Sequence, residues 1–116
     1  MLYTEILNNN RDFLALYHKG KFTASKNIVI YVRKNNLPFN RLGITAGKKI
    51  GNAVHRNRAK RLIRQAYREN ELVMPVGIDI VIVARASLCS VKSTELSQYM
   101  KKYGIPEIYR LIFDSH

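Results

Sequence analysis

The sequence predicts an α+β fold in which helices pack against a single β-sheet. Two observations lead to this fold class. Alternating, β-branched segments are separated by segments in which apolar residues recur every three or four positions. With 47% hydrophobic residues, a chain of 116 residues has material for one sizeable core. We therefore expect residues 1–116 to form one single-domain α/β sandwich with the order α-β-β-(β)-α-β-α, the bracketed strand being a short optional one near residues 22–24.

The first predicted helix covers residues 8–20. An asparagine can cap its start, and Gly20 directly after Lys19 is typical of the left-handed residue that ends many helices. Phe13 and Tyr17 are four residues apart, so they lie on the same face of this helix.

Two predicted strands follow, at 26–35 and 41–47, with the turn "NNLPFN" between them. In each strand, large apolar residues occupy every second position, and they form the face that points to the core. The residues between them form the opposite face. If the strands are neighbours, the opposite face combines an aromatic ring and a guanidinium with very small side chains. We expect that face to be open to a large, flat ligand. Its members are Val29, Tyr31, Arg33, Gly43, Thr45 and Gly47.

The second half predicts a long helix, a central strand and a closing helix. The segment 77–85 is apolar on both faces, as buried strands are. The segment 93–104 has a helical apolar stripe and is capped by Gly104, and 105–113 adds a last helical turn or two. The long helix spans 52–70 and buries a stripe made of Ala59, Leu62, Ile63, Ala66 and Tyr67.

The positive charge is confined to one part of the chain. The net charge is +12, and fourteen of the twenty Lys and Arg residues lie between 13 and 68, where there is no acid. A solvated surface held by salt bridges would mix the two signs. Segregation of one sign points to a polyanion, with nucleic acid first and an anionic membrane second. The longest apolar run, near "IDIVIVARA", is too short to span a bilayer.

The long helix carries the strongest signal for phosphate binding. Arg56, Lys60 and Arg64 recur every four residues, a spacing at which like charges destabilise a helix by about 0.2–0.5 kcal/mol per pair. Two such pairs occur, Arg56 with Lys60 and Lys60 with Arg64, and no acid is available for pairing until the helix ends. We interpret the surface as phosphate-binding rather than merely solvated. It comprises Lys48, Lys49, Arg56, Asn57, Lys60, Arg61, Arg64 and Arg68.

Aromatic residues of the first helix and the first strand suggest a site for a single strand. Proteins hold single-stranded nucleic acid in basic grooves with aromatic rings on which bases stack. Phe13, Tyr17 and Tyr31 fit that design, and Arg33 shares the face of Tyr31. Each ring also has a structural reading: Phe13 as a core residue, and Tyr17 as a cap on the core with its hydroxyl in solvent. Tyr31 is the strongest candidate.

The sequence offers no catalytic or metal-binding constellation. There is no Ser-His-Asp order, no glycine-rich phosphate loop and no pair of carboxylates. The histidines and the single cysteine, Cys89, lack the spacing of metal ligands. One unpaired cysteine and a start without a secretion signal favour a cytoplasmic protein.

Three alternatives remain open at this point. A simple RNA-binding or ribosome-associated module explains the charge but not the pairing of a basic helix with an aromatic face. A helix-turn-helix DNA-binding protein needs a short helix where "RLGITAG" predicts a strand. A protein nuclease needs clustered acids for metal, and the sequence has none.

The segment "KKIGNAVHRNRAKRLIRQAYR" resembles the signature of bacterial ribonuclease P protein subunits. That pattern is a Lys-rich strand end, a Gly-Asn-Ala-Val turn, an Arg-Asn-Arg core and further Lys and Arg residues along a helix. The core is Arg56, Asn57 and Arg58 in this chain. The segments "RDFLALYHKG", "IVIYV", "RLGITAGKKIG" and "IDIVIVAR" are similar to the family's first helix and its strands, so the resemblance covers roughly residues 8–103.

The resemblance implies a small partner of a large catalytic RNA. Together they would remove the 5′ leader from precursor tRNA, with catalysis by the RNA and its magnesium ions and no catalytic side chain in the protein. The Arg-Asn-Arg helix would face the catalytic RNA. A cleft containing Phe13, Tyr17 and Tyr31 would hold the leader, with Lys60, Arg61 and Arg64 at its edge or against RNA. No membrane or protein partner is implied.

The resemblance also implies a left-handed β-α-β crossover, the opposite of the usual hand. Two segments depart from the family pattern. The start, "MLYTEILNNN", lacks the usual basic residues, and the tail "GIPEIYRLIFDSH" is apolar, so we assign the tail no role in RNA binding.

Overall fold

The computed structural model describes residues 1–113, so Asp114, Ser115 and His116 at the end of the predicted domain and tail lie outside the described residues. Within residues 1–113 there are five strands and four α-helices, with short turns of other helix types between some of them. In chain order they are β1 (Thr4–Ile6), α1 (Asn10–Lys19), β2 (Lys21–Ala24), β3 (Ile28–Lys34), β4 (Asn40–Thr45), α2 (Ala53–Asn70), β5 (Ile78–Ala84), α3 (Ser93–Tyr99) and α4 (Ile105–Phe113).

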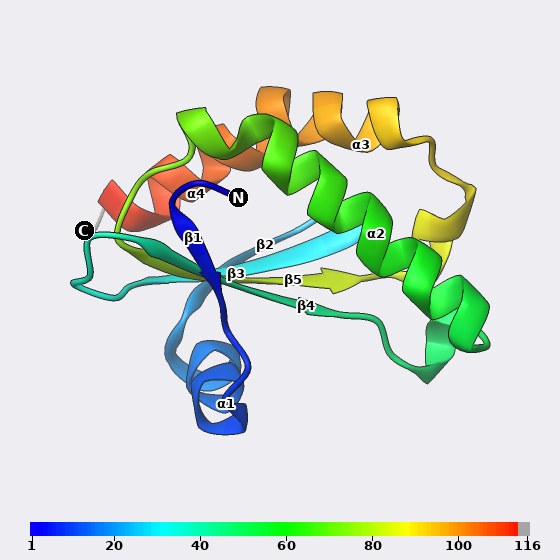
Figure 1. The fold of residues 1–116 in the computed structure, drawn as a ribbon, viewed down its shortest axis with the longest axis horizontal. Coiled ribbons are helices and arrows are strands. Elements are labelled where there is room, and N and C mark those ends of the chain that lie inside the picture. Colours follow the sequence, from blue (N-terminus) through cyan, green and yellow to red (C-terminus); the bar gives the residue numbers. More distant parts are fainter. Residues whose placement is uncertain (114–116) are drawn as a thin grey trace.

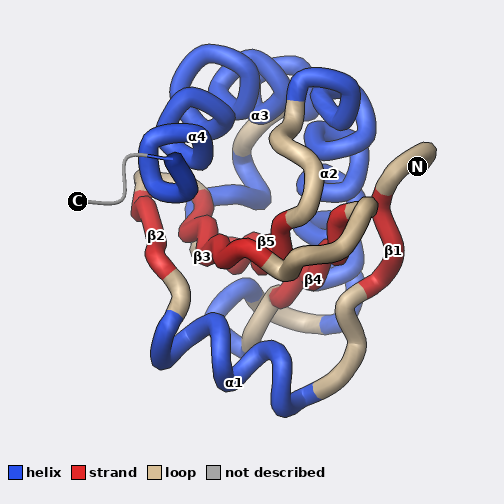
Figure 2. Tube along the Cα trace, turned by 90° about the vertical axis from the view of Figure 1, so that its left-hand side faces the viewer, coloured by secondary structure: helices blue, strands red, loops and turns tan. Residues whose placement is uncertain are grey.

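The strands form one sheet in the order β1-β4-β5-β3-β2. β1, β4 and β5 are parallel, whereas β3 is antiparallel to both β5 and β2. Figures 1 and 2 show that α1 alone covers one face of the sheet and that α2, α3 and α4 cover the other. The predicted α+β sandwich is therefore confirmed, and the optional strand near residues 22–24 exists as β2.

The larger core lies between the sheet and the three helices α2, α3 and α4. The core-facing residues of the two central antiparallel strands are buried there, together with the predicted stripe of α2. These residues are Ile28, Ile30, Val32, Ile80, Ile82, Ala59, Leu62, Ile63, Ala66 and Tyr67. A second, smaller cluster lies under α1, where Leu7, Leu16 and Val81 are buried. The period-two and period-3.6 patterns thus placed the core faces correctly.

The crossover from β4 through α2 to β5 is left-handed. Figure 1 shows β5 running from left to right, so Figure 2, seen from the left, looks along the parallel strands β4 and β5 towards their carboxyl ends. In that view α2 lies above the sheet and β5 lies to the left of β4. Connections of this kind are right-handed in almost all proteins. The hand implied by the family resemblance is therefore confirmed.

Strand β1 was not predicted, because a three-residue strand has too little alternation to be recognised. Its partners explain it. The Glu71 carboxylate, just after α2, accepts hydrogen bonds from the backbone N–H groups of Leu2 (2.7 Å) and Tyr3 (3.1 Å) and from the Thr4 hydroxyl (2.5 Å). Burial by itself raises the pKa of Glu71, but these hydrogen bonds lower it by more, so its net pKa lies below the usual value. Glu71 thereby holds β1 against β4.

The first predicted helix ends as expected, because Gly20 follows Lys19 and its N–H donates to the Leu16 carbonyl, but Gly20 is extended rather than left-handed (φ −72°, ψ 158°). The chain passes directly from α1 into β2 there. The predicted end of the helix 93–104 is wrong. Gly104 caps nothing; it is buried in a π-helical turn, Met100–Gly104, that joins α3 to α4. A Cβ at Gly104 would lie 3.3 Å from the Met100 sulfur and 3.7 Å from Ile30, so glycine allows this turn to pack closely on the sheet.

A buried carboxylate ties α1 to three strands. Asp79 on β5 is fully buried and accepts hydrogen bonds from Arg41 on β4 (2.7 Å to each oxygen), Arg33 on β3 (3.0 Å) and Asn35 (3.0 Å). Both guanidinium groups also pair with Asp12 on α1, at 3.2 and 3.6 Å. Burial alone raises the pKa of Asp79, but the hydrogen bonds from Arg41, Asn35 and Arg33 outweigh it and keep the pKa below its ordinary range.

The Asp79 network predicts a loss of stability in acid. A carboxyl whose pKa is lower in the folded than in the unfolded state stabilises the fold above its unfolded pKa of about 3.9, and this contribution disappears as the pH falls through the folded value. We expect the free energy of unfolding, measured by urea denaturation from pH 7 to pH 3, to be level down to about pH 5 and to fall below about pH 4.

Asp79→Asn should cost about 3 kcal/mol at neutral pH and should reduce the loss of stability in acid, because the titrating group is gone. Glu69→Gln, at an exposed acid near the end of α2, is the matched control and should leave the profile unchanged. An Asp79→Asn protein with the wild-type acid profile would show that this carboxylate does not govern the acid sensitivity.

Candidate RNA-binding site

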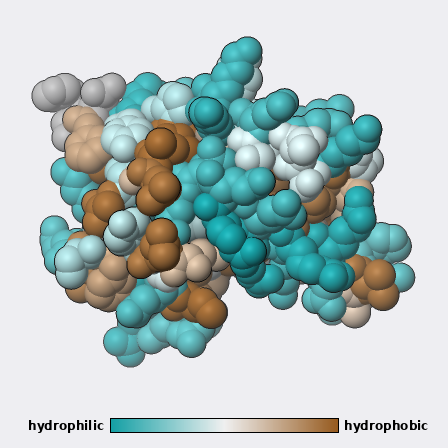
Figure 3. All heavy atoms as spheres, turned by 45° about the horizontal axis from the view of Figure 1, so that its top comes forward, coloured by the Kyte–Doolittle hydropathy of each residue, from teal (hydrophilic) through white to brown (hydrophobic). Residues whose placement is uncertain are grey.

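The exposed side of α2 is a nearly continuous cationic surface. The helix begins where the side chain of Asn52 accepts a hydrogen bond from the His55 N–H (3.0 Å). Because successive residues turn by about 100°, Asn57, Arg61, Arg64 and Arg68 lie opposite the buried stripe. Arg56 and Arg58 lie on the two sides of the helix, next to the margins of the buried stripe. Lys60 lies beside Arg64. Seen from the side of the helices, hydrophilic side chains gather over α2 (Figure 3).

Four of the predicted phosphate-binding residues line one hollow of about 400 Å³: Asn57, Lys60, Arg61 and Arg64. Lys48 and Lys49 are exposed on a short helical turn that precedes α2. Within residues 1–113, none of the predicted cations on α2 or this turn forms an ion pair with a carboxylate. Their charge is therefore available to an anionic ligand.

The aromatic residues form a row between α1 and the sheet. The ring centroids of Phe13 and Tyr17 are 6.4 Å apart, and those of Tyr17 and Tyr31 are 5.0 Å apart in an edge-to-face arrangement. Phe22 on β2 continues the row, 5.6 Å from Tyr31. Phe22 was not predicted as a site residue, although its place in the optional strand beside the aromatic strand was a signal in the sequence that could have identified it.

The expected open space on the sheet is partly filled by the protein itself. A Cβ at Gly43 would lie 2.5 Å from Cζ and 2.7 Å from Cε1 of Phe13, so the Phe13 ring lies directly over Gly43. At Gly47, by contrast, no atom lies within 4 Å of such a Cβ. The flat group over the centre of the small-residue face is therefore the ring of Phe13, and the free surface begins beyond it.

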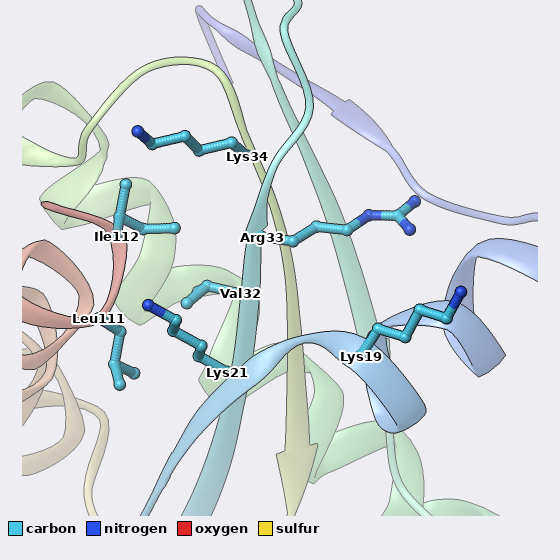
Figure 4. Close-up of a pocket in the computed structure, with 7 residues that line it drawn as sticks. All are labelled: Lys19, Lys21, Val32, Arg33, Lys34, Leu111 and Ile112. Carbon is cyan, nitrogen blue, oxygen red and sulfur yellow. The ribbon is translucent and has the colours of Figure 1, made fainter. Parts of the chain in front are cut away.

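Arg33 has a different position from the other predicted leader-binding residues. It shares the sheet face of Tyr31, but its guanidinium is bound to Asp79 and Asp12. In the close-up of Figure 4, Arg33 points to the same side as Lys19, whereas Lys21 and Lys34 point towards Leu111 and Ile112 of α4. The structure thus gives Arg33 a structural partner, and sequence could not show it because Asp79 is distant in the chain.

The basic helix and the aromatic row meet at one edge of the sheet. β1 ends at Ile6, and a hollow of about 180 Å³ between β1, β4 and α2 is lined by Phe13 and Ile44 together with Lys60 and Arg64. Two cations of α2 therefore lie beside the first ring of the row. This junction makes one continuous surface out of two features that are separate in the sequence.

A second group of cations lies at the far end of the sheet. Lys26, Lys49, Arg85 and Ser87 line a hollow of about 550 Å³. Arg85 donates to the Ser25 carbonyl (3.0 Å), and the Ser87 hydroxyl donates to the Lys26 carbonyl (2.8 Å), so the turn between β2 and β3 is fixed to the end of β5. Sequence reasoning missed Lys26 and Arg85 because nothing local indicates that these segments meet.

Among residues 1–113, no three His, Cys, Asp or Glu side chains are arranged to hold a metal ion. The described helices include none long and apolar enough to cross a membrane.

A cationic helix joined to a row of aromatic rings on an α/β sandwich defines a nucleic-acid-binding protein. Residues 1–104 match the family described as Ribonuclease P. The ribonuclease P protein component of Lachnoclostridium phytofermentans is 42% identical over 112 residues, which cover 97% of this chain and 95% of that protein. This chain belongs to the ribonuclease P protein family.

Solved structures agree with this assignment. The Staphylococcus aureus ribonuclease P protein superposes with a TM-score of 0.78 at 29% identity, covering 92% of this chain and 96% of that one. The Thermotoga maritima ribonuclease P protein gives a TM-score of 0.76 at 35% identity, covering 84% and 92%. The protein is thus an RNA-binding component of the ribonucleoprotein endonuclease that matures the 5′ ends of tRNAs. The family resemblance noted in the sequence is confirmed.

The contact between Phe13 and Gly43 predicts the effect of one added methyl group. Gly43→Ala must displace the Phe13 ring or α1, and we expect it to lower the free energy of unfolding by about 1–3 kcal/mol, as overpacking does. Gly47→Ala, in open space, should change stability little. Urea denaturation of the two variants makes the comparison, and equal stabilities would mean that α1 is free to move away from the sheet.

Proposed function

We propose that α2 binds the catalytic RNA subunit of ribonuclease P, and that the aromatic row binds the single-stranded 5′ leader of precursor tRNA. The observation that carries this proposal is the junction where Lys60 and Arg64 of α2 lie beside Phe13. A single strand leaving an RNA held on α2 passes directly onto the row from that point.

The chemistry of α2 suits a folded RNA. Its cations, from Arg56 to Arg68, are spread along more than three turns of helix. They have no carboxylate partners within residues 1–113, so each can replace a counterion of an RNA phosphate. Such contacts fix position and orientation without reading sequence. Arg56, Asn57, Arg58, Lys60, Arg61, Arg64 and Arg68, with Lys48 and Lys49 ahead of the helix, are the proposed contacts.

The aromatic row suits a leader of variable sequence. Every base has a face that stacks on an aromatic ring, so Tyr17 and Tyr31 can hold a strand whatever its bases are. The cations Lys26 and Arg85 line a hollow at the far end of the sheet and can neutralise further phosphates of the strand. Phe13 contributes through its exposed edge, since its ring is held over Gly43.

We place the cleavage chemistry and its magnesium ions on the RNA subunit. Asp12 on α1 and Asp79 on β5 are both paired with Arg33 and Arg41, so they do not form a metal site. The protein supplies charge neutralisation, stacking and orientation, which lower the free energy of the bound precursor in its reactive geometry. We also place the protein in the cytoplasm, because its one cysteine, Cys89, is free in the structure.

Cleavage of a precursor tRNA tests the proposal directly. The cognate catalytic RNA is assayed at low magnesium with and without the protein, and the length of the released leader is measured. We expect correct leader removal only when the protein is present, because its cations replace part of the magnesium needed to neutralise phosphates. A folded protein that gives no stimulation at any magnesium concentration would contradict the proposal.

A substitution on α2 separates binding of the RNA subunit from other effects. Arg61→Ala should weaken the complex and flatten its salt dependence, reducing the slope of log K against log salt by about 0.7 to 0.9 for one lost phosphate contact. Lys101→Ala, at an exposed cation between α3 and α4, is the control and should keep the wild-type slope. If both variants behave alike, α2 is not the RNA-binding surface.

A further inference from the structure

Phe22 is the outermost ring of the aromatic row, and it is the most exposed of the four. It remains 58% exposed, whereas Tyr17 is 38% exposed and Phe13 and Tyr31 are half-buried. Single exposed hydrophobic residues are common on protein surfaces and mean little. Phe22 differs because its ring continues an ordered set of rings, 5.6 Å from Tyr31.

The backbone fixes the side of the sheet on which Phe22 lies. β2 is an edge strand, and Phe22 is directly opposite Tyr31 in its antiparallel pairing with β3. Residues opposite each other in a sheet point to the same face. The neighbouring Lys21 points to the other face, towards Leu111 of α4 (Figure 4). Phe22 therefore presents its ring to the side of the sheet that α1 covers only in part.

The row runs across the strands rather than along them. Phe13 lies over Gly43 of β4, Tyr31 belongs to β3 and Phe22 to β2, with β5 lying between β4 and β3. Neighbouring strands are about 4.8 Å apart, so the row spans about 14 Å. A stacked strand rises by about 3.4 Å per nucleotide, so this length accommodates several nucleotides.

The two ends of the row differ in their surroundings. Phe13 lies beside Lys60 and Arg64 of α2, whereas Phe22 lies at the opposite edge of the sheet. If α2 holds the catalytic RNA, the bond to be cut lies nearest the Phe13 end. The nucleotide that reaches Phe22 is then the one farthest from that bond, towards the 5′ end of the leader.

We propose that Phe22 forms a fourth stacking position, at the open edge of β2, for one upstream base of the leader. The inference rests on the proposed function and extends it, since it assigns a leader length at which binding should reach its maximum. Leaders that stop short of β2 cannot use Phe22, and leaders that reach it gain one stacked base.

A series of precursor tRNAs shortened one nucleotide at a time from the 5′ end provides the test. Their dissociation constants are measured with the complete ribonucleoprotein in calcium, which slows cleavage. With the wild-type protein, affinity should rise with leader length and then level off. Phe22→Ala should abolish the last step of that rise, which for one stacked base is a change of about 5- to 150-fold in the dissociation constant. The affinity for shorter leaders should stay the same.

Further variants distinguish stacking from support of the fold. Phe22→Trp should restore the last step, because any aromatic ring can stack. Phe113→Ala, at a phenylalanine of α4 with 56% exposure, is the matched control and should keep the wild-type profile. Tyr31→Ala should lose affinity already at shorter leaders. An abasic residue at the last effective nucleotide should lower wild-type affinity to that of Phe22→Ala and should not weaken Phe22→Ala further.

Two outcomes would overturn the inference while leaving the proposed function intact. One is a Phe22→Ala profile that matches the wild type at every leader length. The other is an equal loss at all lengths, which would mean that Phe22 only supports Tyr31. A wild-type profile that is flat from the shortest leader onward would instead reject leader binding by the row as a whole.

Discussion

The ion-pair network of Asp79 is the interaction on which the geometry of the site depends. Its buried carboxylate binds Arg33 and Arg41 from the two flanking strands, and both guanidinium groups reach Asp12 on α1. A buried carboxylate without these partners would be strongly destabilising, so the partners are held firmly in place. The network therefore fixes where α1 crosses the sheet, and with it the positions of Phe13 and Tyr17.

Three acids of this protein make internal contacts that hold its elements together. Asp79 and Asp12 hold α1, and Glu71 holds β1 through the backbone of Leu2 and Tyr3. Each of these carboxylates is satisfied by internal donors, and none forms an ion pair with a cation of α2. Within residues 1–113 the cations of α2 form no ion pair with a carboxylate, so their charge is available to an anionic ligand. Charges are thus divided in space. Asp12 and Asp79 are held in internal ion pairs with arginines of the sheet, whereas the cations of α2 form a surface without such pairs.

The left-handed crossover determines how the two binding surfaces meet. Because β5 lies on the central side of β4, α2 stays near the β1–β4 edge of the sheet, as Figure 2 shows. There β1 is too short to cover the end of β4, so Lys60 and Arg64 reach the same hollow as Phe13 from the other side. A longer β1 would separate the cationic helix from the aromatic row.

The sequence by itself determined what depends on local periodicity. It determined the core faces of the strands, the helix 52–70 with its cationic arc, and the shared face of Phe13 and Tyr17, because these follow from the 3.6- and two-residue repeats. Only the tertiary structure decided which distant residues meet. It placed Phe22 opposite Tyr31, Phe13 over Gly43 and Arg33 on Asp79, and it added β1 to the sheet. Strand order brings these residues together, and the order of strands in a sheet leaves no periodic trace in the chain.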